Sequence, residues 1–436
     1  MKRVLTIALA GLLLASCASS DQRSSVLKVY NWSDYIDEDL LGEFETWYEE
    51  QTGEPIKVIY QTFDINESML AKIEKGHEDY DVVCPSDYMI ERMLREDLLL
   101  PIERDFGDTP NYIDGATSKY IKECFNDIDG YGKNANDYSV GFMWGTTGIL
   151  YNTAYVTREE ASTWNIIRNE KFAGKILIKD APRDVYAPIL ICMRQDEINS
   201  GKTTIKNLMF DCSDESLADF EEYMSHVKPL VAGWEADFGK EQMTQEKAWI
   251  NYTWSGDAVW AIEEAADVDV ELAYTVPEEG STVWFDGWVI PKYAGNIKAA
   301  EYFINFMCIP ENAIRNSDAT GYVSANGGRE VLEAMIDSTF DPVDVRYFFN
   351  EEDSLVCLDP ALYPDQSVID HCAMEHDSGE RTKYLLEAWA RIKGDNATTF
   401  TYVVIFTTLA LLIGGSVYKK GKKRRRKIQH RKMKRK

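Results

Sequence analysis

In the first quarter of the chain, segments whose hydrophobic residues repeat as in a β-strand take turns with segments whose hydrophobic residues repeat as in an α-helix. Val26–Trp32 alternates as a strand does, and Pro55–Tyr60 and the short apolar run Tyr80–Val83 have the composition of two further strands. Between them, Asp37–Gln51 and Asn66–Lys75 repeat apolar residues at helical spacing, and a glycine follows the end of each. This alternation predicts a parallel sheet covered by helices, which places a ligand at the carboxyl ends of the strands.

Later segments extend the same pattern. The Gly-rich, extended stretch Ser139–Asn152 is interpreted as a crossing into a second lobe, and a second α/β region runs to about residue 284. Asn296–Cys308 is predicted to be a helix that ends before a proline, and Arg381–Lys393 to be the last helix of the body. With 436 residues, 45% of them hydrophobic, the chain is long enough for two cored domains.

The N-terminus has the pattern of a secretory signal. Two basic residues precede an apolar run from Val4 to Leu14, which is too short to be a good membrane span. Leu14–Cys17 resembles the bacterial lipobox, in which the cysteine is lipidated and becomes the new N-terminus. We therefore expect residues 1–16 to be a signal peptide, Cys17 to carry lipid and 17–25 to be a linker. The alternative is an ordinary signal peptide with an incidental cysteine.

The C-terminus predicts a membrane anchor. After a linker at 394–399, the 19 residues 400–418 carry no charge, and a helix of that length spans roughly the ~30 Å hydrocarbon core. Residues 419–436 hold 13 Lys or Arg and no acid, as expected for a basic tail on the cytoplasmic side. The sequence thus predicts a C-terminal transmembrane helix and disfavours a nucleic-acid-binding tail, which needs no adjacent apolar run.

The net charge limits which classes of partner the protein can bind. The net charge is −26, and without that basic tail 34 basic residues remain against 73 acidic ones, a net charge of −39. Such a body does not bind nucleic acid and attracts cations through long-range steering. Acidity alone is weak support, because many secreted proteins are acidic for solubility.

Cysteine and histidine usage gives no metal site. Seven cysteines remain besides Cys17, without CxxC spacing, and neither a disulfide framework nor a zinc site follows from them. The group His371, Cys372, Glu375, His376 and Asp377 looks metal-like, because His371 and Glu375 share a helical face, but it lacks a known zinc spacing. We expect no metal and no cofactor.

Six motifs in order carry a resemblance to a known family. They are Val29–Ile36, Tyr80–Ser86, Trp144–Gly145, Trp254–Asp257, Trp284–Asp286 followed by Ile290–Pro291, and Gly321–Tyr322. Over residues 26–393 the chain resembles the spermidine/putrescine-binding periplasmic receptors of ABC transporters. Each motif is weak alone, whereas six in order with fitting spacing are a strong signal.

The resemblance implies a fold and a function. The fold is an α/β, two-lobed periplasmic-binding-protein fold of type II-like arrangement with discontinuous lobes: 26–142 and 286–330 form lobe 1, and 143–285 and 331–393 form lobe 2. The implied function is not enzymatic. It is the capture of spermidine or putrescine between the lobes, at the periplasmic face of the cytoplasmic membrane, and delivery to ABC permease subunits.

The resemblance also implies the site residues. Trp254 and Trp284 would sandwich the methylene chain, with Asp257 and Asp286 as the principal ammonium partners. The other expected positions are Trp32, Ser33, Asp34, Tyr35, Ser86, Asp87, Tyr88, Asp180, Asp184, Tyr322 and Glu375. Asp184 matches the family's acidic motif better than Asp180, and Glu375 stands where relatives place an amide or an apolar residue. Acids for the ends and aromatic rings for the chain are what a polyamine requires.

Other functions remain possible from the residues. A receptor for a different small cation, for thiamine or for ferric ion could share the fold, while an anion receptor would need Arg, Lys and helix N-termini at the matched positions. A carboxylate-based hydrolase such as a glycosidase is a weaker alternative, because no nucleophile elbow, HExxH or phosphate loop is present. A membrane-anchored sensor is disfavoured, because the basic tail is too short for a signalling domain. The sequence does not decide between putrescine and spermidine.

Overall fold

The computed structural model describes residues 23–236, 238–351 and 355–394. The chain divides into a compact unit that ends at Trp389 and a second unit from Ala390, of which only residues 390–394 are described. The first unit contains the main sheet and every described site residue.

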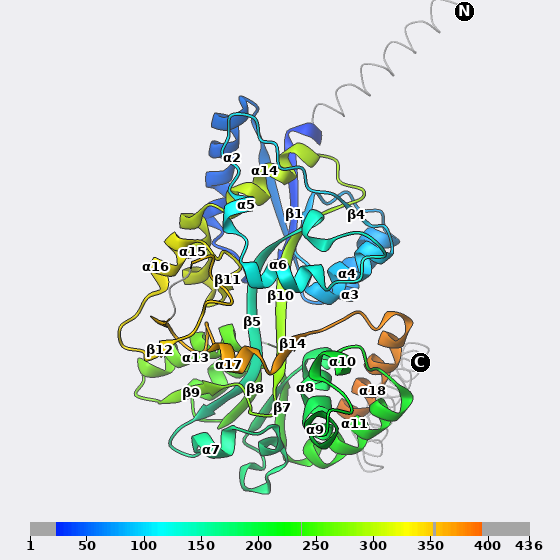
Figure 1. The fold of residues 1–436 in the computed structure, drawn as a ribbon, viewed down its shortest axis with the longest axis vertical. Helices are drawn as coiled ribbons and strands as arrows, with labels where there is room; N and C mark the ends of the chain where they lie inside the picture. The colour runs from blue at the N-terminus through cyan, green and yellow to red at the C-terminus, as the bar shows by residue number, and fades with distance from the viewer. Residues whose placement is uncertain (1–22, 237, 352–354, 395–436) are drawn as a thin grey trace, which may run out of the picture. The chain divides into compact units, whose positions relative to one another are not determined.

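Two long strands connect the two halves of a mixed sheet (Figure 1). They are β5 (Ser139–Asn152) and β10 (Ser281–Pro291), which pair antiparallel with a register shift between Asp286 and Gly287. The strand order is β2-β1-β3-β10-β5-β8-β6-β7, so β10 and β5 stand between a first set and a second set of strands. This arrangement confirms the predicted two-lobed α/β fold, whereas the exact lobe boundaries remain a prediction.

The first lobe is built on parallel pairs of β1 with β2 and of β1 with β3. Its strands and main helices are β1 (Val26–Trp32), α2 (Asp39–Thr52), β2 (Lys57–Phe63), α3 (Asn66–Glu74), β3 (Val82–Val83), α4 (Asp87–Arg95), β4 (Leu99–Leu100), α5 (Ile113–Ala116), α6 (Lys119–Asn126), α14 (Ile297–Met307), α15 (Pro310–Thr320), β11 (Val323–Ser324) and α16 (Arg329–Met335). The apolar stripe of α2 buries Leu40, Phe44 and Tyr48, and Gly53 ends the helix in the left-handed conformation at φ 72°.

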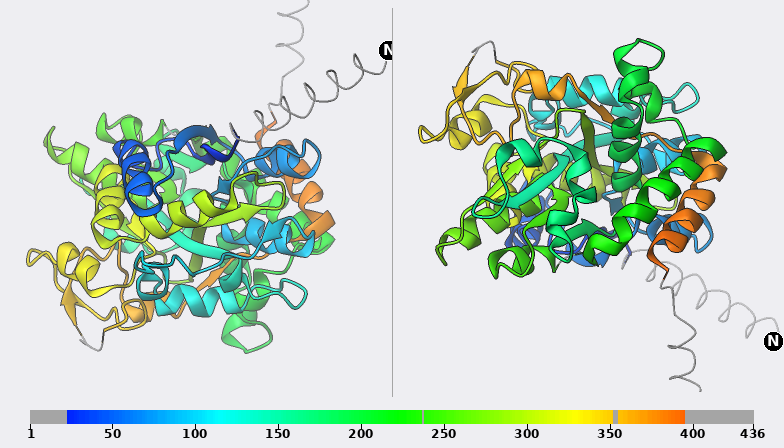
Figure 2. Two further views of the ribbon diagram at one scale, coloured as in Figure 1. Left: turned by 90° about the horizontal axis from the view of Figure 1, so that it is seen from above. Right: turned by 90° about the horizontal axis from the view of Figure 1, so that it is seen from below.

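Helices cover both faces of this lobe's strands. One buried cluster joins Phe44 of α2 and Phe303 of α14 to Val29 and Trp288 of the sheet. A second joins Met69 of α3 and residues of α4 and α6 to the opposite face. The views along the strands in Figure 2 show helices on both sides of them. Burial of both faces explains why β3 consists of two valines, both buried.

The second lobe repeats the arrangement with β6 parallel to both β7 and β8. Its strands and main helices are α7 (Arg158–Ala161), β6 (Ile176–Lys179), α8 (Pro182–Met193), α9 (Gln195–Asn199), α10 (Ile205–Leu208), α11 (Asp214–Val227), β7 (Val231–Glu235), α12 (Gly239–Thr244), β8 (Ile250–Trp254), α13 (Ser255–Ala266) and β9 (Leu272–Thr275). The remaining elements are β12 (Pro342–Val343), β13 (Val356–Cys357), α17 (Gln366–Ile369), β14 (Cys372–Met374) and α18 (Thr382–Lys393).

The predicted C-terminal transmembrane helix must be corrected. Among the described residues no helix is long and apolar enough to cross a membrane. The longest described helices, α2 and α11, have 14 residues each, and at 1.5 Å per residue they extend about 21 Å against a hydrocarbon core of ~30 Å. The segment 400–418, on which the prediction was placed, lies outside the described residues, as do Cys17 and the basic tail.

Candidate functional site

The first-lobe part of the site lies where β1 and β3 end. Both strands run parallel, so the residues after their carboxyl ends meet at one edge of the sheet. Tyr35 follows β1 and is buried, and Ser86 follows β3 and forms an isolated antiparallel bridge with Asp286 of β10. Three segments far apart in the sequence thus meet at this edge.

Asp286 is the acid at the centre of this edge. Its carboxylate is 6% exposed and accepts a 2.8 Å hydrogen bond from the hydroxyl of Tyr35. Burial raises the pKa of Asp286 to about 6, against the lowering effect of hydrogen bonds from Ser86 and Tyr35 and with a further increase from the charge of Asp184. Among the described residues no basic side chain is paired with Asp286, and a buried carboxylate in that condition is well suited to receive a cation.

The carboxylate of Asp87, unlike that of Asp286, is bonded to the protein backbone. Its two oxygens accept hydrogen bonds from the backbone N–H groups of Tyr88, at 2.6 Å, and Phe285, at 3.2 Å. It therefore fixes the start of α4 against β10. Burial raises the pKa of Asp87 well above its usual range, and backbone hydrogen bonds oppose the shift. Next to it, Asn66 donates to the hydroxyls of both Ser86, at 3.1 Å, and Tyr88, at 3.0 Å.

The second lobe contributes Trp254 and Asp184. Trp254 ends β8 and donates its indole N–H to Asp184, near the start of α8, at 3.0 Å. Burial raises the pKa of Asp184, although the bond from Trp254 lowers it. The buried guanidinium of Arg183 lies 4.2 Å from the ring centre of Tyr88, so this cation connects the second lobe to the first.

Glu375 follows β14 and joins the same acidic group. It is 7% exposed, and its Oε1 atom has no hydrogen-bond partner among the described residues. Burial raises the pKa of Glu375 well above its usual range, the charge of Asp184 raises it further, and Arg183 lowers it. The Arg183 guanidinium thus interacts electrostatically with Asp184 and Glu375, and Asp184 interacts in turn with Asp286.

Asp257 is already paired with cations of the protein. One carboxylate oxygen lies 2.5 Å from Nζ of Lys179, and the other accepts a 2.9 Å hydrogen bond from Tyr322 and lies 3.4 Å from Nζ of Lys240. Burial raises the pKa of Asp257, but the charges of Lys179 and Lys240 outweigh it and lower the pKa below its usual value.

Aromatic rings connect these acids. The ring of Tyr322 lies 5.2 Å from that of Tyr35 and 5.6 Å from that of Trp284, centre to centre, both in edge-to-face geometry. Two glycines permit this packing. A Cβ atom on Gly145 would lie 2.5 Å from Trp284, and one on Gly256 would lie 2.3 Å from Tyr322. We call Tyr35, Asp184, Trp254, Asp257, Trp284, Asp286, Tyr322 and Glu375 the acidic–aromatic cluster.

Four of the expected residues lie apart from this cluster. Ser33 and Asp34 are exposed, and Ser33 donates to Asp64 at 3.2 Å. Asp180 is exposed and accepts a 2.8 Å hydrogen bond from the indole of Trp389. Trp32 is half-buried and packs on Phe63 at 4.4 Å. Their assignment to the site remains a prediction.

Sequence reasoning missed two buried cations, Lys179 and Arg183. The signal was present, because Lys179, the last residue of β6, directly precedes the acidic motif at 180–184 and Arg183 lies within that motif. The charged group of a lysine at a strand end is usually solvated, whereas Lys179 is 1% exposed. Acids alone were considered as site residues in that motif.

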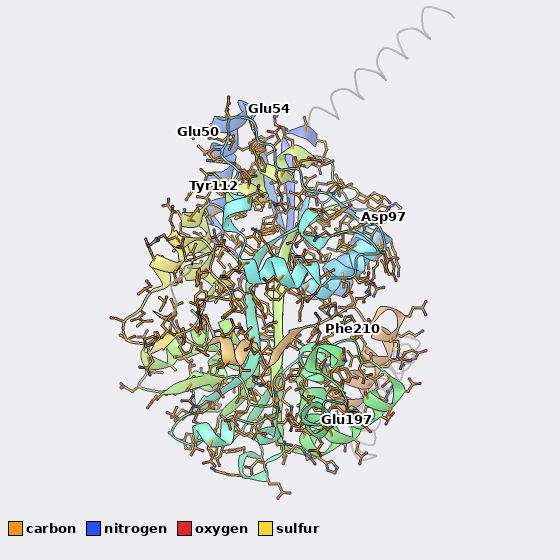
Figure 3. The ribbon with its side chains drawn as sticks, in the orientation of Figure 1. Glu50, Glu54, Asp97, Tyr112, Glu197 and Phe210 are labelled. Carbon is orange, nitrogen blue, oxygen red and sulfur yellow. The ribbon has the colours of Figure 1, made fainter. Side chains whose placement is uncertain are left out.

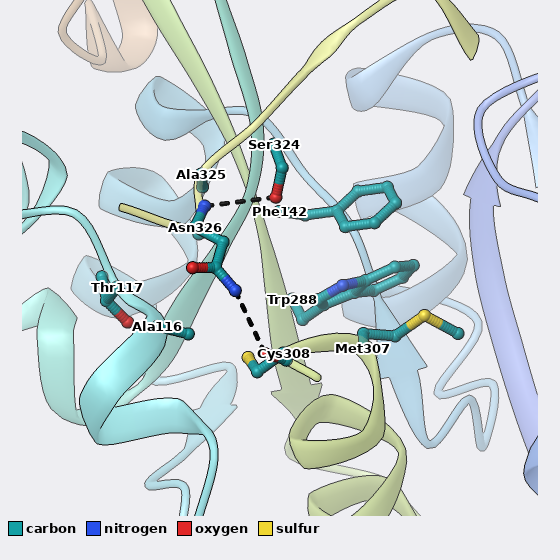
Figure 4. Close-up of a pocket in the computed structure, with 10 residues that line it drawn as sticks. Ala116, Thr117, Phe142, Trp288, Met307, Cys308, Ser324, Ala325 and Asn326 are labelled. Atoms are coloured by element: carbon teal, nitrogen blue, oxygen red, sulfur yellow. Dashed lines mark hydrogen bonds between the residues drawn. The ribbon is translucent and has the colours of Figure 1, made fainter. Parts of the chain in front are cut away.

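Two small cavities accompany the site, each of about 10 Å³, roughly the size of one water molecule. One, shown in Figure 4, is lined by Phe142, Trp288 and Asn326 and contains none of the cluster residues. The other touches Arg183 and Glu375. Neither of these two cavities is large enough for a diamine.

The metal-like group at 371–377 does not converge. His371 is exposed and bonds the carbonyl of Ser367, while His376 is buried, bonds Glu91 at 3.1 Å and stacks on Phe210 at 3.8 Å. No group of three or more possible metal ligands occurs in the part of the chain that the structure describes. Acidic side chains elsewhere, such as Glu50, Glu54 and Asp97 in Figure 3, lie on the surface, so the net charge is not confined to the site.

Two α/β lobes joined by paired crossing strands, with acids and aromatic rings gathered between them, define a solute receptor. Residues 46–334 match the model of the bacterial extracellular solute-binding proteins, and the chain belongs to this family. It is 27% identical over 390 residues to the spermidine/putrescine-binding periplasmic protein of Escherichia coli K12, covering 89% of this chain and 97% of that protein. It is 26% identical over 362 residues to the putrescine-binding periplasmic protein PotF of the same organism, covering 79% and 91%.

A solved structure agrees with these relatives. The spermidine/putrescine ABC transporter substrate-binding protein PotD of Streptococcus pneumoniae matches with a TM-score of 0.63 and 29% sequence identity. The match covers 85% of this chain and 99% of that protein.

Proposed function

We propose that this chain is the extracytoplasmic receptor of an ABC importer for polyamines. It captures a small organic amine between its lobes and delivers it to the permease subunits, without catalysing a reaction on it. The single observation that carries the proposal is an excess of acids: among the described residues, the buried Asp286 and Glu375 and the half-buried Asp184 outnumber the cations beside them, Arg183 and the Asp257-paired Lys179.

An excess of carboxyl groups over cations favours the binding of a positively charged ligand. A buried carboxylate pays a desolvation cost that an incoming ammonium offsets, and removal of such a partner typically costs ~3–5 kcal/mol. Aromatic rings complement the rest of the ligand, because Trp254, Trp284 and Tyr322 offer apolar faces to methylene groups and π faces to ammonium groups, worth ~0.5–2 kcal/mol for each contact.

The named relatives support the same ligand class, because they are spermidine/putrescine- and putrescine-binding periplasmic proteins. Their names also support an extracytoplasmic location. We further propose that Cys17 carries the lipid that the lipobox-like segment predicts. Labelling with a fatty-acid analogue in cells, lost in Cys17→Ala, checks this, and labelling that persists in the variant would contradict it.

Calorimetry with purified protein tests the ligand class. Putrescine, cadaverine, spermidine and spermine are titrated beside two matched controls, n-butylamine with one ammonium and 1,4-butanediol with none. We expect at least one polyamine to bind with micromolar or better affinity, about −8 kcal/mol or stronger, and both controls to bind at least 100-fold more weakly. If no polyamine at millimolar concentration gives heat or a thermal shift, the proposed function is wrong.

A further inference from the structure

The ammonium group of Lys179 occupies the kind of position that a polyamine ammonium would take. Its Nζ atom lies 2.5 Å from a carboxylate oxygen of Asp257, 3.4 Å from Oε1 of Glu235 and 4.4 Å from the ring centre of Trp254. A carboxylate pair beside an indole face is a favourable environment for a desolvated ammonium. The side chain is 2% exposed, so the charge is held inside the protein.

Charges around Asp257 balance without a ligand. Two acids, Asp257 and Glu235, face two lysines, Lys179 and Lys240. Both oxygens of Asp257 are engaged, one by Lys179 and the other by Tyr322 and Lys240. We call these four charged residues the balanced group.

The charges on the other side of the aromatic rings do not balance. Arg183 acts on Asp184 and Glu375, and Lys179, already counted in the balanced group, also acts on Asp184. Among the described residues the three acids thus gain one further cation, which leaves two negative charges in excess once all three ionise. Asp87 adjoins them, but both of its oxygens already accept backbone N–H groups. We call Asp184, Asp286, Glu375 and Arg183 the unbalanced group.

We propose that Lys179 is a resident counter-ion that determines specificity, so that the receptor selects diamines and disfavours triamines. This inference rests on the proposed function. A diamine carries two positive charges, which match the excess of the unbalanced group. The additional ammonium of a triamine would meet the balanced group, where Asp257 has no unmet charge and Lys179 repels another cation.

The test compares the dissociation constants of putrescine and spermidine for three proteins. The wild type is expected to bind putrescine at least tenfold more tightly than spermidine. Lys179→Met removes the charge and keeps an unbranched side chain of nearly the same length, so spermidine affinity should rise at least tenfold relative to putrescine affinity. Lys175→Met is the matched control, because that lysine also lies over an indole, 4.9 Å from the ring centre of Trp249, but within the described part of the chain its ammonium bonds backbone carbonyls and no acid. It should leave the ratio unchanged.

Loss of Lys179 leaves buried acids unpaired, so thermal melting accompanies each titration. Lys179→Gln, which keeps a hydrogen-bond donor, is measured in parallel. Spermidine should restore the melting temperature of both variants more than putrescine does, because it supplies the missing cation. If neither variant melts cooperatively even with spermidine, the inference is overturned.

The other outcomes separate the two proposals. A wild type that binds spermidine as tightly as putrescine, or a folded Lys179→Met protein with the wild-type ratio, overturns the role of Lys179 and leaves the proposed function intact. A wild type that binds neither amine overturns both.

Discussion

The hydroxyl of Tyr35 donates a 2.8 Å hydrogen bond to the carboxylate of Asp286 across 251 positions of sequence. Tyr35 follows the first strand of the sheet, and Asp286 lies on the strand that returns from the second lobe. The bond holds one carboxylate oxygen in place, and no basic side chain is paired with this acid among the described residues. An ammonium ligand would therefore complete a site that is already oriented.

Asp286→Asn should weaken diamine binding by about 100-fold or more. Loss of a buried partner of an ion pair costs ~3–5 kcal/mol, which corresponds to that range. Asp34→Asn is the matched control, since Asp34 is exposed and lies apart from the cluster, and it should change the affinity less than threefold. Calorimetry measures both, and a loss below threefold for Asp286→Asn would show that this acid does not hold an ammonium.

The same substitution should stabilise the ligand-free protein at neutral pH. The pKa of Asp286 is raised from 3.8 to about 6 in the fold, so the folded state prefers the protonated form. The protonated carboxyl group therefore contributes to the free energy of unfolding, and this contribution is fully present below pH 4. It is lost as the pH rises through 6, and the loss amounts to about 3 kcal/mol at most, because the pKa differs by about two units between the folded and unfolded states. An asparagine does not ionise and avoids this loss. Denaturant unfolding of Asp286→Asn and of the wild type at pH 4 and pH 8 checks this. The stability of the variant relative to the wild type should be greater at pH 8 than at pH 4, and the same relative stability at both pH values would contradict the assignment.

Diamine affinity should fall as the pH decreases from 7.5 to 5. Putrescine stays fully charged over this range, whereas Asp286, with a pKa of about 6, becomes about 90% protonated at pH 5 and loses its attraction for an ammonium. Burial also raises the pKa of Asp184 and Glu375, which adds to the effect. We expect the dissociation constant to rise at least tenfold. A flat profile in the wild type would argue against recognition by these acids.

Gly256→Ala should weaken binding through Tyr322. The new Cβ would lie 2.3 Å from the tyrosine ring, so the ring must shift and its contacts with Asp257 and Trp284 change. Gly42→Ala is the control, because nothing lies within 4 Å of its Cβ position on α2, and alanine favours a helix. Affinity measurements should show a loss of about tenfold or more for the first variant only.

Trp254→Ala should also reduce affinity about tenfold or more while the protein keeps a cooperative unfolding transition. Its indole is half-buried and binds Asp184, and it covers the ammonium of Lys179, so it acts as a wall of the site. Circular dichroism and melting accompany the titration. An unfolded variant would instead identify Trp254 as a core residue.

Local pattern was sufficient to predict several strands and helices, most of them in the first quarter of the chain. The helix predicted at Asn66–Lys75 is observed at Asn66–Glu74, and the last helix, predicted at Arg381–Lys393, begins at Thr382. Apolar periodicity reports which face of an element is buried, and that information is local. The segment after α16 had no such pattern, and its Phe348 and Tyr363 pack with Trp144 of β5 through tertiary contacts alone.

The candidate site was less predictable than the fold. The positions of Tyr35, Trp284 and Asp286 follow from strand ends and motif order, and the structure brings these residues into one cluster. The ion pair of Lys179 with Asp257 joins residues 78 positions apart, on β6 and α13. No periodicity encodes which acid a lysine will meet, because that depends on how the two elements pack. Asp257, expected from the sequence to meet an ammonium of the ligand, is instead paired with Lys179, whereas Asp286 has no such partner among the described residues.

The register shift between Asp286 and Gly287 places this acid at an irregularity in one of the two strands that connect the lobes. On one side of it β10 pairs with β14 at Val283, and on the other with β3 at Val289. A bulge interrupts the ladder and bends a strand locally, so flexing of the connection concentrates there. If Asp286 holds an ammonium as proposed, the ligand's charge would be received where a strand that joins the two lobes bends, so binding would act directly on the connection between the lobes.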